Sequence, residues 1–210
     1  MTFLGYEIDS IRIEVSLPLD RLTKCRELIH TCCQKPKLTL RQRQSILGTL
    51  NFACAVIMPG RAFLRRLIDL TMGISKPFHF IRITKEMRED VQLWGSFLTD
   101  FNGRSLFHPD VWCDSTSLNL YTDASGSLGY GAVYGSRWLY GAWSDEWKGC
   151  NITLLELYPI VLAVTTWGAL LSNHCIHFHI NNLALVSIIN QQASRDKHIM
   201  HFVRRLVITC

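Results

Sequence analysis

The sequence predicts an α/β protein in which a mainly helical N-terminal region precedes a mixed sheet with helices. Two observations support this prediction. Apolar residues recur at helical spacing up to about residue 100, and beyond residue 116 short strand-like segments punctuated by glycine alternate with apolar runs. At 210 residues, 48% of them hydrophobic and 19% charged, the chain can bury a substantial core and does not have a disordered composition.

The N-terminal region is expected to begin with a hairpin and to continue as helices. Residues 3–8 and 12–15 have the pattern of two short paired strands. Thr39 and Gln42 fit a capping box that would open a long helix, and Pro59-Gly60 is expected to break it. The apolar positions of the expected helices lie in residues 22–32, 46–57, 61–72 and 87–98, the last helix being capped by Thr84.

The C-terminal region is expected to begin with antiparallel strands and to continue through a parallel crossover. We place the boundary between residues 102 and 116, which gives domains 1–115 and 116–210. The expected strands are Leu118–Thr122, Gly131–Tyr134, Arg137–Trp143 and Ile176–Ile180, and the expected helices are Leu154–Leu171, Leu183–Gln191 and Lys197–Ile208.

Basic residues are concentrated in residues 21–66, which contain ten lysines and arginines and only one acidic residue, Glu27. Such an imbalance favours a phosphate-facing surface, and the alternative is a solvated helical face. The candidates for nucleic-acid binding are Lys35, Lys37, Arg41, Arg43, Arg61, Arg65 and Arg66.

Cysteine usage and the N-terminal residues indicate an intracellular protein of the nucleus or cytoplasm. The eight cysteines are scattered through apolar contexts, as reduced buried residues are, and do not form a disulfide framework. The start of the chain lacks the basic and apolar segments of a secretory signal. No apolar run is expected to reach the roughly 18 residues that span a bilayer, so no membrane partner is predicted.

Asp123 and Glu156 are the candidate metal-binding carboxylates. Asp123 follows an expected strand and opens a turn of small residues, whereas Glu156 lies in a long apolar helix. Convergent carboxylates can hold two Mg²⁺ or Mn²⁺ ions for phosphodiester hydrolysis. Each residue also has a structural explanation, because Asp is common in turns and Thr153 with Glu156 fits a capping box.

Two other groups of residues could bind ligands, and structural roles are favoured for both. Cys175, His177 and His179 would share one face of a strand, but neighbours on that face are about 6.5–7 Å apart, too far to assume that they meet on one zinc ion. Seven aromatic residues near the turn at Asp123 could stack on nucleotides, although core and sheet-face packing is the favoured use for most of them: Tyr121, Tyr130, Tyr134, Trp138, Tyr140, Trp143 and Trp147.

The chain resembles the C-terminal part of a retroelement reverse transcriptase with its ribonuclease H domain, most closely that of DIRS-like (tyrosine-recombinase) retrotransposons. The matching segments, in order, are FLGYEID, LTLRQRQSILGTLNFA, MPGRAFLRRLIDL, LWGSFLTDFNG, LYTDASGSLGYGAVY, ITLLELYPIVLAVTTWG and INNLALVSIIN. The resemblance implies the end of a palm with its primer grip in residues 1–16, a thumb in 17–75, a connection in 76–115 and a ribonuclease H-like fold in 116–210. It also implies an RNA–DNA hybrid or duplex DNA as partner.

The departures from this family pattern imply weak or absent activity. Asn181 stands where the family has Asp, so Asp123, Glu156 and Asn181 would be the catalytic set and only the first two would be anionic metal ligands. The polymerase aspartates and a fourth nuclease carboxylate would lie outside these residues. The ribonuclease H-like domain is therefore expected to be C-terminally truncated, with a partner chain covering its edge. The alternative function is a non-catalytic nucleic-acid-binding or interaction module.

Overall fold

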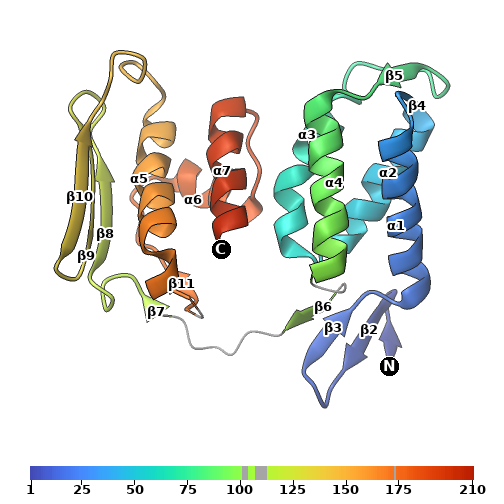
Figure 1. Ribbon diagram of the computed structural model, residues 1–210, viewed down its shortest axis with the longest axis horizontal. Coiled ribbons are helices and arrows are strands. Elements are labelled where there is room, and N and C mark those ends of the chain that lie inside the picture. Colours follow the sequence, from blue (N-terminus) through green and yellow to red (C-terminus); the bar gives the residue numbers. More distant parts are fainter. Residues whose placement is uncertain (101–103, 107–112, 173) are drawn as a thin grey trace. The chain divides into compact units, whose positions relative to one another are not determined.

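The computed structural model describes residues 1–100, 104–106, 113–172 and 174–210 and confirms the mixed α/β class (Figure 1). The chain forms two compact units, Met1–Phe107 and His108–Cys210. Residues 113–114, which the sequence places in the first domain, belong to the second unit, because they pair with a strand there.

The first unit is built on helices whose buried faces match the predicted periodicity. In α2 the buried residues recur every three or four positions, and in α4 Met87, Val91, Trp94 and Leu98 are all fully buried. Both predicted N-caps are present, and Thr84 accepts a hydrogen bond from the Met87 amide at 3.2 Å. The helices are α1 (Leu19–Gln34), α2 (Leu40–Ala53), η1 (Met58–Phe63), α3 (Arg65–Asp69) and α4 (Lys85–Asp100).

The prediction of a long third helix over residues 61–72 is wrong. The chain instead makes a 3₁₀ turn, η1, followed by the five-residue helix α3. Pro59 sits in the first turn of η1, where its missing N–H is tolerated. Gly60 packs so closely on the buried Trp94 ring that a Cβ there would overlap it. Because this segment packs tightly against α4, it forms η1 and the short α3 and not one regular helix. The preceding helix, α2, also ends earlier than expected, so Ile57 lies outside it.

Two small sheets lie at opposite ends of the helices of the first unit (Figure 1). The predicted N-terminal hairpin is present and extended by further strands, giving the order β1-β2-β3-β6. A second, two-stranded sheet joins β4 and β5 in antiparallel register. The strands are β1 (Thr2–Phe3), β2 (Tyr6–Asp9), β3 (Glu14–Ser16), β6 (Arg104–Leu106), β4 (Lys37–Thr39) and β5 (Phe80–Arg82).

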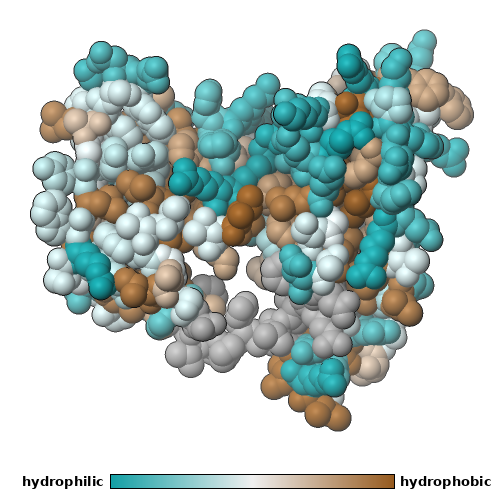
Figure 2. Space-filling view, viewed as in Figure 1, coloured by the Kyte–Doolittle hydropathy of each residue, from teal (hydrophilic) through white to brown (hydrophobic). Residues whose placement is uncertain are grey.

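The N-terminal hairpin exposes several large apolar side chains. Leu4, Ile11 and Ile13 are 77%, 93% and 57% exposed, and apolar surface is visible on this hairpin in Figure 2. The hairpin is fastened to the helices on its other side, where Tyr6 stacks on Phe52 of α2 with ring centroids 4.5 Å apart. The hairpin therefore contacts the helices through one aromatic pair. The loops on either side of β2 do not pack against the core.

The second unit contains the predicted antiparallel sheet, in the order β10-β9-β8. Paired residues share a face, so Leu120 and Tyr134 lie on one side, and Tyr121, Val133 and Trp138 on the other. The strands are β8 (Leu120–Ala124), β9 (Gly129–Tyr134) and β10 (Arg137–Ala142).

Helix α5 (Ile152–Trp167) covers the inner face of this sheet (Figure 1). Its Ala163 and Trp167 form the buried cluster with Leu120 and Ala132. The run from Ile152 to Leu170, which includes the 3₁₀ turn η2 (Gly168–Leu170), is long and apolar enough to cross a membrane by length and composition, contrary to the sequence-based expectation. Since 56% of it is buried within the protein, it has the properties of a core helix.

The remaining elements of the second unit are largely as predicted, except for the strand after α5. That strand, expected over residues 176–180, is reduced to β11 (Ile176–His177), which pairs in parallel with β7 (Cys113–Asp114). Helix α6 (Leu183–Gln191) has the predicted bounds, and α7 (Lys197–Thr209) packs beside α5 (Figure 1).

Candidate nucleic-acid interface and carboxylate site

One face of α2 is open to solvent and combines a basic residue, small polar residues and a glycine. The positions follow helical spacing along the side opposite the buried residues of the helix. Arg41, Gln44, Ser45 and Gly48 are exposed, and Thr49 and Phe52 continue the same face as half-buried residues.

A cavity of about 340 Å³ lies along this face of α2. Its walls come from α2 and from the first half of α1, which contributes Arg21 and Cys25. Gly48 lies in its wall, and a Cβ added there would meet nothing within 4 Å. The absence of a side chain at this position lets a bound backbone approach the helix closely.

Arg21 is held at the aromatic end of the cavity. Its guanidinium lies 5.4 Å from the ring centroid of Phe52, within the range of a cation–π contact. Phe52 is itself stacked on Tyr6, whose hydroxyl donates to the Phe52 carbonyl at 2.9 Å. The sequence prediction did not include Arg21 among the site residues. The exposed face of α2 could have been predicted from the helical spacing of its polar and small residues at positions 41, 44, 45 and 48.

Arg43 is not available to nucleic acid, so its prediction as a binding residue is wrong. It is fully buried on the inner side of α2 and donates to the carbonyls of Leu70 at 2.9 Å and Arg82 at 3.0 Å. Burial lowers the pKa of this guanidinium below its ordinary value. The helical period separates it from its exposed neighbour Arg41, which lies two positions earlier.

The other predicted basic residues differ in what they contact. Arg65 pairs with Asp69 at 2.6 Å, and Arg66 pairs with the buried Asp90 at 2.8 Å. Their charges are thus partly compensated within the first unit. The exposed members of the predicted set are Lys35, Lys37, Arg41 and Arg61.

Glu156 accepts a hydrogen bond from Asn182, which was not among the predicted site residues although it adjoins Asn181. The Asn182 side-chain amide donates to Glu156 Oε2 at 2.8 Å and to Thr153 Oγ1 at 3.2 Å, while its Oδ1 caps α6 through the Leu185 amide. Asn181, the predicted member of the site, is exposed beside it. An Asn directly before an apolar run is a typical N-cap and could have pointed to residue 182.

The capping box predicted for Thr153 and Glu156 is wrong, because α5 begins earlier. Asn151 is the N-cap and accepts from the Thr153 amide at 2.9 Å. Thr153 and Glu156 therefore lie inside the helix, and both face the N-terminus of α6 through Asn182. Together they join two helices of the second unit.

Asp123 occupies the exposed face of β8. It alternates with Thr122 and shares its side with Tyr121, which is 53% exposed, whereas Leu120 on the other side packs toward α5. Over the described ranges, no three His, Cys, Asp or Glu side chains are placed to hold a metal ion together. Asp123 on β8 and Glu156 in α5 stay predicted metal ligands.

The aromatic residues beyond Asp123 divide into two groups. Tyr130, Trp143 and Trp147 cluster with Tyr158 of α5, with ring centroids 4.7 to 5.7 Å apart, as core packing predicts. Trp138 and Tyr140 instead stack on each other on the outer sheet face and are 67% and 76% exposed.

Comparison with known proteins finds limited similarity. No protein-family model matches the chain, and no curated protein matches it. A foamy viral protease-reverse transcriptase in complex with double-stranded DNA is 16% identical, with a TM-score of 0.40 over 89% of this chain and 32% of that chain. The same viral enzyme in complex with an RNA/DNA hybrid is 15% identical, with a TM-score of 0.37 over 97% of this chain and 27% of that chain. The chain thus spans about a third or less of their length.

Replacing Arg43 with Leu is predicted to lower the free energy of unfolding by about 2–4 kcal/mol, since two partly buried carbonyls lose their donor. Chemical denaturation followed by circular dichroism measures this change. Arg41→Leu is the matched control, being the same substitution on the exposed side of the same helix, and should change stability by less than about 0.5 kcal/mol. Equal effects of the two substitutions would contradict the burial of Arg43.

Replacing Asn182 with Ala is predicted to destabilise the second unit by about 1–2 kcal/mol, because the α6 cap and the bond to Glu156 are both removed. Asn181→Ala, at the exposed neighbouring position, should have an effect within about 0.5 kcal/mol. Thermal unfolding of the two variants compares them directly. A larger destabilisation by Asn181→Ala would show that residue 181 makes the important contact.

Proposed function

We propose that the chain is a retroelement-derived reverse transcriptase and ribonuclease H fragment that binds a primer–template duplex or an RNA–DNA hybrid. The observation that carries this proposal is the open face of α2, with its cavity and its central glycine. The sequence resemblance to DIRS-like elements supports the same assignment, since the segment LTLRQRQSILGTLNFA covers this helix.

The chemistry of the α2 face suits a nucleic-acid backbone. Lys35, Lys37 and Arg41 are exposed around the N-terminus of α2, where the helix dipole adds to their positive charge. Gln44, Ser45 and Thr49 offer hydrogen bonds to sugar and phosphate oxygens without demanding a particular base sequence. We therefore expect binding that depends on salt and on duplex shape more than on sequence.

Removing the charges at the start of α2 is predicted to weaken duplex binding and its dependence on salt. The triple variant Lys35→Gln, Lys37→Gln, Arg41→Gln should lower the slope of log K against log salt concentration by about 2–3, about one for each phosphate that the variant no longer neutralises. Fluorescence anisotropy with a labelled duplex at several salt concentrations measures the slope. Arg65→Gln is the control, because Arg65 is paired with Asp69, and a slope that falls only in this control would overturn the assignment.

Filling the cavity is predicted to block binding without harming the fold. Gly48→Leu should weaken duplex affinity tenfold or more, a change of about 1.4 kcal/mol, because the side chain would occupy the space above the helix. Leu is the better helix former, so folding should not suffer. Gly48→Ala is the smaller control. Unchanged affinity in a correctly folded Gly48→Leu protein would place the duplex elsewhere.

We propose in addition that hydrolysis of RNA–DNA hybrids by this chain is weak or absent. Two features support this: Asn181 brings no charge to a metal ion, and the Glu156 carboxylate already accepts a bond from Asn182. Asp123 and Glu156 would be the ligands of any Mg²⁺ or Mn²⁺ that is held. The alternative function is a non-catalytic binding or interaction module. Such a module would use the same α2 surface and would have no hydrolytic activity at all.

The expected result is no cleavage of a hybrid above background with Mg²⁺ or Mn²⁺ present, in a time course resolved by gel electrophoresis. Asn181→Asp tests whether a restored carboxylate recovers any cleavage. The proposal fails if the unaltered chain cuts the hybrid and Asp123→Asn abolishes the cut, since that pair of results would identify the activity as its own.

A further inference from the structure

Two exposed histidines lie side by side on one face of the segment that begins at β11. Ile176 and Phe178 pack against the hydrophobic cluster of the second unit, so the alternating residues His177 and His179 point the other way and are exposed. The parallel register places Asp114 of β7 opposite His177, and hence on the same face.

The two imidazole rings are closer than backbone spacing alone requires. Alternate residues of an extended strand are about 6.5–7 Å apart, yet the ring centroids of His177 and His179 are 5.2 Å apart and the planes are inclined by 18°. Because the rings are stacked, their nitrogen lone pairs lie in nearly parallel planes, and a shared ion requires one ring to rotate. Both side chains are at the surface and can rotate to present a nitrogen to the same ion.

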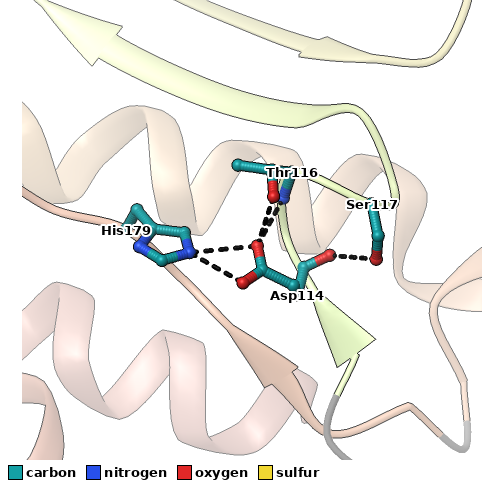
Figure 3. Close-up of polar contacts among 4 residues, drawn as sticks. All are labelled: Asp114, Thr116, Ser117 and His179. Atoms are coloured by element: carbon teal, nitrogen blue, oxygen red, sulfur yellow. Dashed lines mark hydrogen bonds and ion pairs between the residues drawn. The ribbon is translucent and has the colours of Figure 1, made fainter.

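Asp114 orients the second of these rings (Figure 3). Its carboxylate oxygens lie 3.0 and 2.8 Å from His179 Nε2, and Oδ1 also accepts from the amide and the hydroxyl of Thr116. The contact uses Nε2, so Nδ1 is the ring nitrogen of His179 that lies outside this bond.

We propose that His177 and His179 form a two-histidine chelate for a divalent transition metal such as Zn²⁺ or Ni²⁺, with Asp114 as the carboxylate that orients His179. A ligating histidine typically donates its other ring N–H to a carboxylate, as His179 does here. Imidazole suits Zn²⁺ and Ni²⁺ and does not suit Mg²⁺. Water completes the coordination, and the site is independent of Asp123, Glu156 and the proposed nucleic-acid binding.

Isothermal titration of the whole chain with NiCl₂ and with ZnCl₂, after removal of bound metal by a chelator, tests the proposal. The unaltered protein should bind one ion at this site. His177→Gln and His179→Gln should each abolish that binding, and Asp114→Asn should weaken it by about 10- to 100-fold. MgCl₂ should give no heat at this site.

His174→Gln is the matched control, because His174 is a nearby exposed histidine whose Nδ1 lies 2.9 Å from the Ser172 carbonyl. It should bind as the unaltered protein does. His177→Gln retains the bond between Asp114 and His179, so its loss of binding cannot be ascribed to a broken β7–β11 contact, and circular dichroism verifies the fold. Unchanged binding in both His177→Gln and His179→Gln, or no binding by the unaltered chain, would overturn the proposal.

Discussion

The packing of the first unit depends on the contacts that hold the buried side of α2 in place. Arg43 is a buried cation on this side, and its guanidinium donates to the carbonyls of Leu70, which follows α3, and Arg82, which ends β5. A buried arginine is tolerated because main-chain oxygens accept from both terminal nitrogens of its guanidinium, although its Nε has no partner. Removing it would take the guanidinium donor away from both partly buried oxygens. These hydrogen bonds and the buried Leu40, Ile46 and Leu50 on the same side together fix the rotation of α2, and therefore which residues face solvent.

The rotation of α2 about its axis matters both for the stability of the first unit and for the proposed binding function, because it determines which residues are buried and which are exposed. With Arg43 and Leu50 turned inward, Arg41 and Gly48 are turned outward, and the cavity beside α1 opens along that side. A helix that carried only charge would bind phosphates without close contact. The glycine allows a backbone to approach, and the aromatic stack of Tyr6 and Phe52 closes one end of the surface.

Much of the fold follows from the sequence, because local signals and burial agree. The capping box at Thr39, the apolar face of α4 and the bounds of α6 are all predictable from residue type and spacing. The segment after Ile57 is not, since its conformation depends on the contact of Gly60 with Trp94, a residue distant in sequence. The site is harder to predict than the fold. Charge counting cannot separate the buried Arg43 from the exposed Arg41, nor can it show that Asn182 reaches Glu156.

The most direct measurement of the central claim is site-specific photo-crosslinking of the whole chain to a labelled duplex. A photoreactive amino acid would replace Ser45 on the open face of α2 or, in a second preparation, the exposed Glu89 on α4. The account predicts a crosslink from position 45 that fades as salt rises and is much stronger than that from position 89. Equal crosslinking from the two positions, or a crosslink only from position 89, would contradict binding through α2.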